Sequence, residues 1–460
     1  MQNRNKYSDM IVCGFALFAI FFGAGNLIFP PYLGVAAGEN WAKAMFGFLL
    51  TDPVLPVLGV IATAMVGGRA DDLGKRVSHK FSTLLGIVAI LTIGPFFAVP
   101  RTAATTHEVA IMQLPMEIPS FVTSVVFFAI TLVLTLNPGK VIDIIGKFLT
   151  PALLVILVGT IIVCIFKPIG AVRPQEDMQF FLMGFKEGYQ TMDALGAALM
   201  AGIVVTDLLR KGYTNTKERF TVTFGTGIVA FVLLGVVYGG LTYVGATASG
   251  LFTPDMPRAE ILVGVFAAMF GTVGKVGIGI AVALACLTTS VGLTATAGNY
   301  FSSITHNKVT YKQVVIVCIV ISTALSLYGV EGLIFKAVPI LSVIYPVLMV
   351  LVVLTLLNKW VKYNLTFTGA VIFTFLISIP ESLNLYMLMN GHTGGAEALA
   401  GIMGMIGKLP FASAGFAFVV PAIVGGIIFT IIAAAGKVGK TIDDMDLLPE
   451  ELTLEEFEAK

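Results

Sequence analysis

Charged residues are scarce in this chain: only 12% of its 460 residues are Asp, Glu, Lys or Arg, and the formal net charge is +1. Hydrophobic residues make up 57%, more apolar surface than a soluble domain can bury. The near-zero net charge excludes the basic surface that binds nucleic acid, so we expect no nucleic-acid partner. No feature points to an obligate protein partner. The composition places the chain in a lipid bilayer.

Cysteine and histidine are also rare, with four residues of each. All four cysteines lie in apolar runs without a CxxC spacing, which predicts small buried residues and neither a disulfide nor a zinc site. The histidines are scattered near the ends of apolar runs, and no nucleophile with a base is apparent. We therefore expect that the protein is not an enzyme.

Apolar runs of about 20 residues, enough for a helix to cross a bilayer, recur from end to end. Most Lys and Arg residues fall in the loops on one side, the side that also carries both ends of the chain. The positive-inside rule makes that side cytoplasmic, and residues 437–460 an acidic cytoplasmic tail. We predict an all-α integral membrane protein, a single transmembrane domain of twelve helices near residues 9–36, 41–66, 80–112, 117–137, 141–167, 178–208, 217–246, 273–304, 311–328, 331–357, 365–388 and 411–436.

The first predicted span is interrupted at bilayer depth by Gly23, Gly25 and Asn26, followed by Pro30 and Pro31. Glycine frees the backbone to leave the helix, and proline removes a hydrogen-bond donor. Unwound backbone inside a membrane lines a cavity or is buried in protein. Its free carbonyls can hold a cation, and the N–H groups that open the second half-helix can hold a carboxylate. The alternative role of the glycines is close helix packing.

The sixth predicted span is interrupted in the same way between Gly188 and Asp193. Two interrupted spans at matching places indicate a binding site between two inverted repeats, here about 9–167 and 178–357, with 365–436 outside them. The repeat rests on hydropathy and on the paired breaks. We predict that the substrate is bound by Gly23, Ala24, Gly25, Asn26, Gly188, Tyr189, Gln190, Thr191, Met192 and Asp193.

Several motifs together resemble one known family. They are residues 23–31 (GAGNLIFPP), 188–195 (GYQTMDAL), 136–140 (LNPGK) and 146–151 (GKFLTP). They are similar to the bacterial branched-chain amino acid:cation symporters of the BrnQ type, and the resemblance extends over essentially the whole chain. It implies a LeuT-like fold with five-plus-five inverted repeats and broken helices 1 and 6. It also implies uptake of leucine, isoleucine and valine with Na⁺ or H⁺ across the bacterial cytoplasmic membrane.

The resemblance further implies a Na⁺ site. In the wider fold, two carbonyls on span one face a carbonyl and two hydroxyls on span eight. The matching positions here are the carbonyls of Ala19, Phe22 and Ala285 and the hydroxyls of Thr288 and Thr289. Five neutral oxygens suit a monovalent cation. The alternative role of the two hydroxyls is bonding to the preceding helical turn.

Charged side chains at bilayer depth cost about 3 kcal/mol or more, so each requires an explanation. Asp193 either attracts the α-amino group of the substrate or the coupling ion, or caps the second half of span six. Asp52, directly before Pro53, is interpreted as a helix restart with a structural role. Arg101 is a candidate gate, with interfacial snorkelling as the alternative.

We thus expect a symporter that imports leucine, isoleucine and valine with Na⁺ by alternating access. Coupling to protons, which Lys147 near the start of span five keeps open, is the alternative. A channel or sensor without concentrative transport is the alternative class, although neither a filter loop nor rings of like residues are apparent. Because an apolar pocket distinguishes isoleucine from valine by only about 1–3 kcal/mol, broad acceptance is expected.

Overall fold

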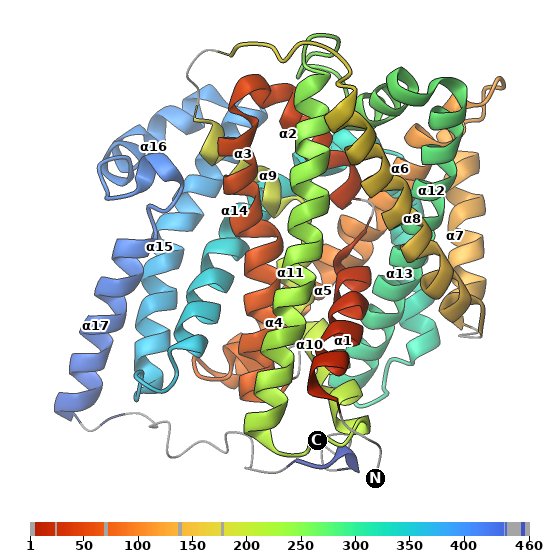
Figure 1. The fold of residues 1–460 in the computed structure, drawn as a ribbon. Helices are drawn as coiled ribbons and strands as arrows, with labels where there is room; N and C mark the ends of the chain where they lie inside the picture. Colours follow the sequence, from red (N-terminus) through yellow and green to blue (C-terminus); the bar gives the residue numbers. More distant parts are fainter. Residues whose placement is uncertain are drawn as a thin grey trace.

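The computed structural model describes residues 5–23, 25–68, 72–136, 140–175, 179–436, 438 and 452–455, without the side chains of 140–152 and 198–200. The regular elements in these ranges are all helices. Most of them run along one common direction, and the connecting segments gather at two ends (Figure 1). Helices satisfy their own backbone hydrogen bonds, as a bilayer requires. The all-α prediction is confirmed.

The first part of the chain forms α1 (Lys6–Phe21), α2 (Gly25–Ala37), α3 (Trp41–Leu49), α4 (Leu55–Val66), α5 (His79–Leu91), α6 (Ala98–Val109), α7 (Ser120–Leu136) and α8 (Lys140–Phe166). The second part forms α9 (Phe180–Tyr189), α10 (Asp193–Arg210), α11 (Thr216–Thr247), α12 (Arg258–Ile304), α13 (Tyr311–Ser326), α14 (Gly329–Leu356), α15 (Asn364–Met389), α16 (Thr393–Ile406) and α17 (Val419–Gly436). Short helical turns complete the list: η1 (Gly38–Asn40), η2 (Leu50–Val54), η3 (Asp72–Gly74), η4 (Thr92–Phe96), η5 (Ile111–Gln113) and η6 (Ala412–Ala414).

Helices and membrane crossings do not correspond one to one. In the described ranges, seven helical stretches are long and apolar enough to cross a membrane, or eight if the bent pair α9 and α10 forms one span. The stretch Gly25–Val66 has 42 residues, about 63 Å of helix at 1.5 Å per residue, roughly twice the hydrocarbon core of a bilayer. It turns at Gly38, where φ is +52°, so that α2 and α3 lie side by side.

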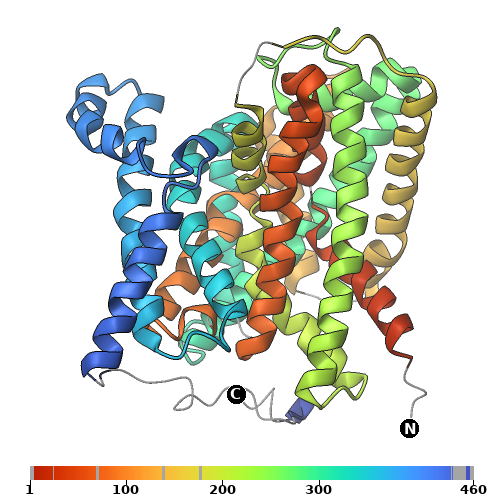
Figure 2. The same cartoon turned by 60° about the vertical axis from the view of Figure 1, so that its left-hand side comes forward.

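Two helices differ from the predicted spans. The helix that contains the predicted span 273–304 begins at Arg258 and bends at Gly271, whose φ is +61°. A glycine permits this left-handed conformation, so one apolar pattern continues through a bend. Helix α16 lies in a segment that hydropathy left between two spans. It belongs with α15 and α17 at one edge of the bundle, all three in blue (Figure 2).

Glycines bring the helices around the first break into backbone contact. Helix α11 packs against both α1 and α2. A Cβ atom at Gly34 on α2 would overlap the Thr242 carbonyl on α11, and one at Gly245 on α11 would overlap the Pro31 carbonyl. Small residues at helix crossings allow such close approach in membranes. The contact fixes α2 and therefore the residues at its start.

Candidate functional site

The first helix is interrupted where the sequence predicts it. Helix α1 ends at Phe21, and α2 begins at Gly25. The N–H of Gly23, which a continuous helix would direct to the Ala19 carbonyl, donates instead to the Phe21 carbonyl at 2.9 Å. The Ala19 carbonyl thereby loses its usual intrahelical donor. Ala24 lies outside the described residues.

The second predicted break is also present. Helix α9 ends at Tyr189 and α10 begins at Asp193, with a bend of 44° between them. Met192 adopts a left-handed conformation with φ 65° at this point. The Met192 carbonyl accepts from the Leu195 N–H at 3.1 Å, whereas the carbonyls of Gln190 and Thr191 are available to other groups. Arg101 on α6 uses them: its Nη1 donates to the Gln190 carbonyl at 2.5 Å, and its Nη2 lies 3.5 Å from the Thr191 carbonyl.

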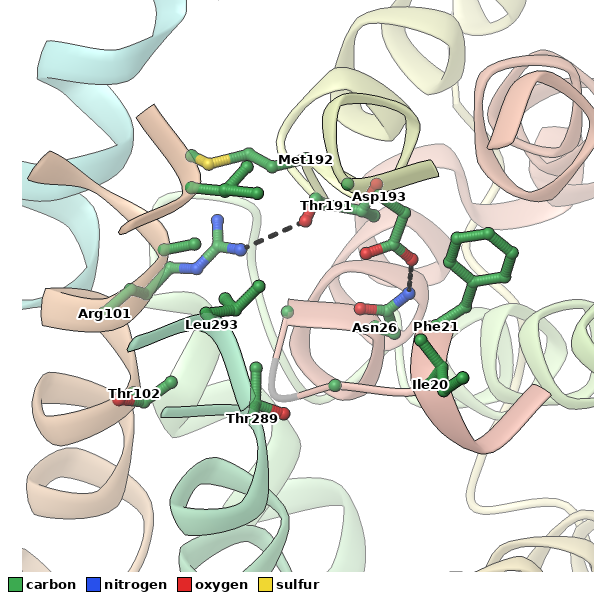
Figure 3. Close-up of a pocket in the computed structure, with 15 residues that line it drawn as sticks. Ile20, Phe21, Asn26, Arg101, Thr102, Thr191, Met192, Asp193, Thr289 and Leu293 are labelled. Carbon is green, nitrogen blue, oxygen red and sulfur yellow. Dashed lines mark hydrogen bonds between the residues drawn. The ribbon is translucent and has the colours of Figure 1, made fainter. Parts of the chain in front are cut away.

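The two breaks meet at a small cavity (Figure 3). Asn26 and Asp193 face each other on one side, and Arg101 reaches toward Thr191 from the other. Polar groups from the breaks and apolar side chains from four helices share the lining, which consists of Ile20, Phe21, Gly23, Gly25, Asn26, Ile93, Ala98, Arg101, Thr102, Thr191, Met192, Asp193, Gly196, Thr289 and Leu293. Its lining offers partners for both the charged and the apolar parts of a small amphiphilic molecule. The free volume is about 40 Å³, smaller than an amino acid, so the helices must move apart to admit one.

Three of the predicted substrate-binding residues lie outside this lining. Gly188 packs so closely against Thr51 that a Cβ atom at Gly188 would overlap the Thr51 hydroxyl. The Tyr189 ring packs against the Tyr345 ring at an angle of 32°, with centroids 4.4 Å apart. Gln190 contributes its carbonyl to Arg101. The last turn of α9 thus contacts neighbouring helices, while the break after it faces the cavity.

A buried polar cluster joins the breaks to two further helices. The Asn26 amide nitrogen lies 2.6 Å from Asp193 Oδ2, 2.5 Å from the Tyr238 hydroxyl and 3.2 Å from Asp52 Oδ2. Asp52 and Tyr238 are completely buried. Sequence reasoning gave Asp52 a structural role only and did not consider Tyr238. The available signal was a carboxylate at bilayer depth.

The predicted Na⁺ ligands on α12 lie beside the first break. The hydroxyls of Thr288 and Thr289 both donate to the Ala285 carbonyl at 2.9 Å, which is the back-bonding that sequence offered as the alternative. Each hydroxyl oxygen still has lone pairs to offer. Thr289 lines the cavity, and its Oγ1 lies 3.3 Å from the position of a Cβ at Gly23. The Phe22 ring stacks on Phe18 at 5.0 Å.

Arg258 at the start of α12 forms an ion-pair cluster that sequence reasoning missed. Its guanidinium binds Glu187 on α9 at 2.6 Å and Glu331 on α14 at 2.5 Å. The Tyr32 ring on α2 lies 4.0 Å from the guanidinium carbon. We call Arg258, Glu187, Glu331 and Tyr32 the Arg258 cluster. It ties together four helices, including those that follow or precede the breaks.

Arg101, the gate candidate from sequence, does not belong to this cluster. Its side chain is buried in the cavity lining. The Phe29 ring on α2 lies near both guanidinium groups, with its centroid 5.3 Å from that of Arg101 and 5.9 Å from that of Arg258. Phe29 is thus a contact that Arg101 and the Arg258 cluster share.

At the opposite end, α1 is held to the segment after α10. Asp9 accepts a hydrogen bond from the Tyr213 hydroxyl at 2.6 Å and lies 3.7 Å from Lys211 Nζ. Lys211 also pairs with Asp207 at 3.0 Å. The side chain of Lys147 and residues 439–451 of the acidic tail lie outside the described residues.

Comparison with known proteins agrees with this geometry. Residues 6–436 match the family described as branched-chain amino acid transport protein. The branched-chain amino acid permease BraB of Bacillus subtilis is 36% identical over 436 residues, which cover 93% of this chain and 96% of that protein. The permease BrnQ of the same organism is 35% identical, with 93% and 97% covered. The closed conformation of Mhp1, a nucleobase-cation-symport-1 family transporter, shares the fold with a TM-score of 0.60 at 12% identity and 93% coverage of each chain.

Proposed function

The chain belongs to the family of branched-chain amino acid transport proteins, and we propose that it is a symporter that imports leucine, isoleucine and valine together with Na⁺. The family consists of multi-pass membrane transporters and not of enzymes. One observation carries the proposal: the cavity at which the two helix breaks meet combines free backbone groups with apolar side chains.

The cavity offers a partner to each part of an amino acid. The N–H groups that open α2 at Gly25 favour the substrate carboxylate, because a helix N-terminus attracts anions. The Asp193 carboxylate and the Thr191 carbonyl favour the ammonium group. The apolar side chain then lies against Ile93 and Leu293. These side chains give apolar contact without hydrogen-bonding groups, so all three branched side chains are accepted.

The proposed Na⁺ site lies between α1 and α12. Its ligands are the carbonyls of Ala19, Phe22 and Ala285 with the hydroxyls of Thr288 and Thr289. Two observations support it: the Ala19 carbonyl lacks its intrahelical donor, and Thr289 lies next to Gly23 at the break. Neutral oxygens match the modest charge of Na⁺.

We also propose that the chain crosses the cytoplasmic membrane of a bacterium twelve times, with inverted repeats at about 9–167 and 178–357. The paired breaks in α1–α2 and α9–α10 support the repeat. The start of α1 and the end of α17 lie at the same end of the bundle, which an even number of crossings requires (Figure 1). That end is cytoplasmic by the distribution of Lys and Arg. The Arg258 cluster then closes the outer side, and the contacts of Asp9 close the inner side.

Uptake of labelled leucine into proteoliposomes tests the proposal. An inward Na⁺ gradient should drive accumulation above equilibrium, which a channel cannot produce. The double variant Thr288→Ala/Thr289→Ala should lose the response to Na⁺. Thr296→Ala is the matched control, because its hydroxyl makes the same back-bond to Gly292 on an exposed face of α12. Uptake that responds only to a pH gradient would overturn the assignment of Na⁺.

A further inference from the structure

We propose that Asp52 and Asp193 form a proton-binding site, distinct from the proposed Na⁺ site, and that leucine displaces its proton. The two carboxylates come from η2 and α10 and are bridged by the amide of Asn26, at 3.2 Å and 2.6 Å. The linkage to leucine rests on the proposed function. The site itself rests on the burial and the charges of the pair.

The charges around the pair do not balance. Arg101 is the cationic side chain beside Asp193, and its guanidinium donates to the carbonyls of Gln190 and Thr191. Two buried carboxylates against one buried guanidinium leave a charge of −1. An uncompensated charge inside a membrane protein is costly, and one bound proton removes it.

Two buried oxygens at the pair lack a hydrogen-bond partner of ordinary geometry, although Tyr238 and Thr191 lie near Asp52. Asp52 is completely buried, and its Oδ1 has no hydrogen-bond partner of ordinary geometry. The hydroxyl of Tyr345 on α14 is equally buried and also lacks a hydrogen-bond partner of ordinary geometry, and it lies close enough to Thr191 and to both carboxylates to interact with them. A buried oxygen without a partner loses its hydration without compensation. A proton on the pair turns one of these acceptors into a donor.

The pair suits a proton better than a metal ion, because among the described residues no group of three or more His, Cys, Asp or Glu side chains could hold a metal. Asn26 and Asp193 line the cavity between the breaks, whereas Asp52 is not among the lining residues. Metal cations in proteins need several oxygens around a space of their own. A proton needs only a carboxylate oxygen. The titratable groups that face the pair from the surrounding helices are Arg101 on α6, Tyr238 on α11 and Tyr345 on α14. Behind them, Tyr189 on α9 lies against Tyr345 and Cys286 on α12 lies near Arg101.

Leucine and the proton compete because both supply one positive charge at the same place. The ammonium group of a substrate in the cavity lies beside Asp193, where it favours the ionised carboxylate. The proton then leaves the pair for solvent as the ammonium arrives. The leucine carboxylate brings a negative charge of its own, which the Na⁺ that binds with leucine in the proposed function offsets, so charge balances in both states. Leucine affinity should therefore rise with pH by up to about tenfold per unit while the empty pair is protonated, because one proton is exchanged for each leucine.

The experiment measures leucine binding and proton release by the purified full-length protein in weakly buffered detergent solution containing Na⁺. Wild type should release up to about one proton per leucine bound. Asp52→Asn should bind leucine with little dependence on pH and release far less. Asp193→Asn, which also removes the proposed partner of the ammonium group, should bind leucine more weakly and without the pH dependence. Asp255→Asn is the matched control, an exposed acid between α11 and α12 that should behave like wild type.

The outcomes separate this inference from the proposed function. Leucine binding by wild type without proton release at any pH would overturn the inference and leave the proposed function intact, even if neither variant folds. Equal proton release by wild type and a folded Asp52→Asn variant would also overturn it. Proton release on addition of Na⁺ alone, abolished in Asp52→Asn, would show a metal site instead. No leucine binding under any condition would refute the proposed function.

Discussion

Replacing Arg258 with glutamine should open the outer side of the transporter. The guanidinium holds Glu187 and Glu331 at 2.6 Å and 2.5 Å, and its side chain is only 11% exposed. Hydrogen bonds between charged groups stabilise by about 1.5–3 kcal/mol. If these contacts exist only while the outer side is closed, their loss shifts the equilibrium by about 2 kcal/mol, or roughly 30-fold, toward the open state.

Labelling of a cysteine in the cavity measures that shift. Ala98 lines the cavity and is small, so Ala98→Cys in a background without the four native cysteines is a conservative probe. A membrane-impermeant maleimide added from outside should react about 30-fold faster when Arg258→Gln is also present. Glu187→Gln should act similarly, and the two substitutions together should do little more, because they remove the same contact.

Arg173 provides the control for this experiment. Arg173 lies on the same side of the bundle with an exposed side chain, so Arg173→Gln should leave the labelling rate unchanged. If Arg258→Gln also leaves it unchanged while the protein remains folded, the Arg258 cluster does not hold the outer side closed. The closure would then have to come from other contacts.

Two further substitutions test the packing and the specificity of the site. Gly34→Ala should destabilise the protein by about 3 kcal/mol or more, because the new Cβ overlaps the Thr242 carbonyl. In thermal unfolding, its melting temperature should be well below that of the control Gly235→Ala, whose Cβ meets nothing within 4 Å. Leu293→Ala enlarges the apolar side of the cavity. Phenylalanine should then inhibit leucine uptake more strongly, with a binding free energy improved by about 1–3 kcal/mol. Unchanged inhibition by phenylalanine would place the substrate side chain elsewhere.

Local sequence signals were enough to locate both helix breaks. Gly23, Gly25 and Asn26 in one span and the polar run ending at Asp193 in another interrupt apolar patterns, and the helices end there. Backbone geometry at a break follows from the residues of the break itself, so no long-range information is needed. The number of crossings is harder to derive, because a helix such as α12 continues through a bend at Gly271.

The partners of the charged residues could not be derived in the same way. Arg258 lies in what hydropathy treats as a loop, and its partners Glu187 and Glu331 are more than 70 residues away along the chain. Asp52 precedes Pro53, and this local pattern fits a helix restart as well as a site residue. Only the packing of η2 against α2 and α10 brings Asp52 to Asn26 and Asp193. Pairwise charge contacts between distant segments are set by the fold, not by local spacing.

The central claim is that two adjacent sites at the broken helices bind leucine and Na⁺ together. Equilibrium binding of labelled leucine to the purified protein, in Na⁺ and in choline at the same ionic strength and pH, tests it most directly. Adjacent sites should couple by about 1–3 kcal/mol, so Na⁺ should tighten leucine binding roughly 5- to 150-fold, and leucine should tighten Na⁺ binding by the same factor. Equal leucine affinity in the two salts would contradict the claim.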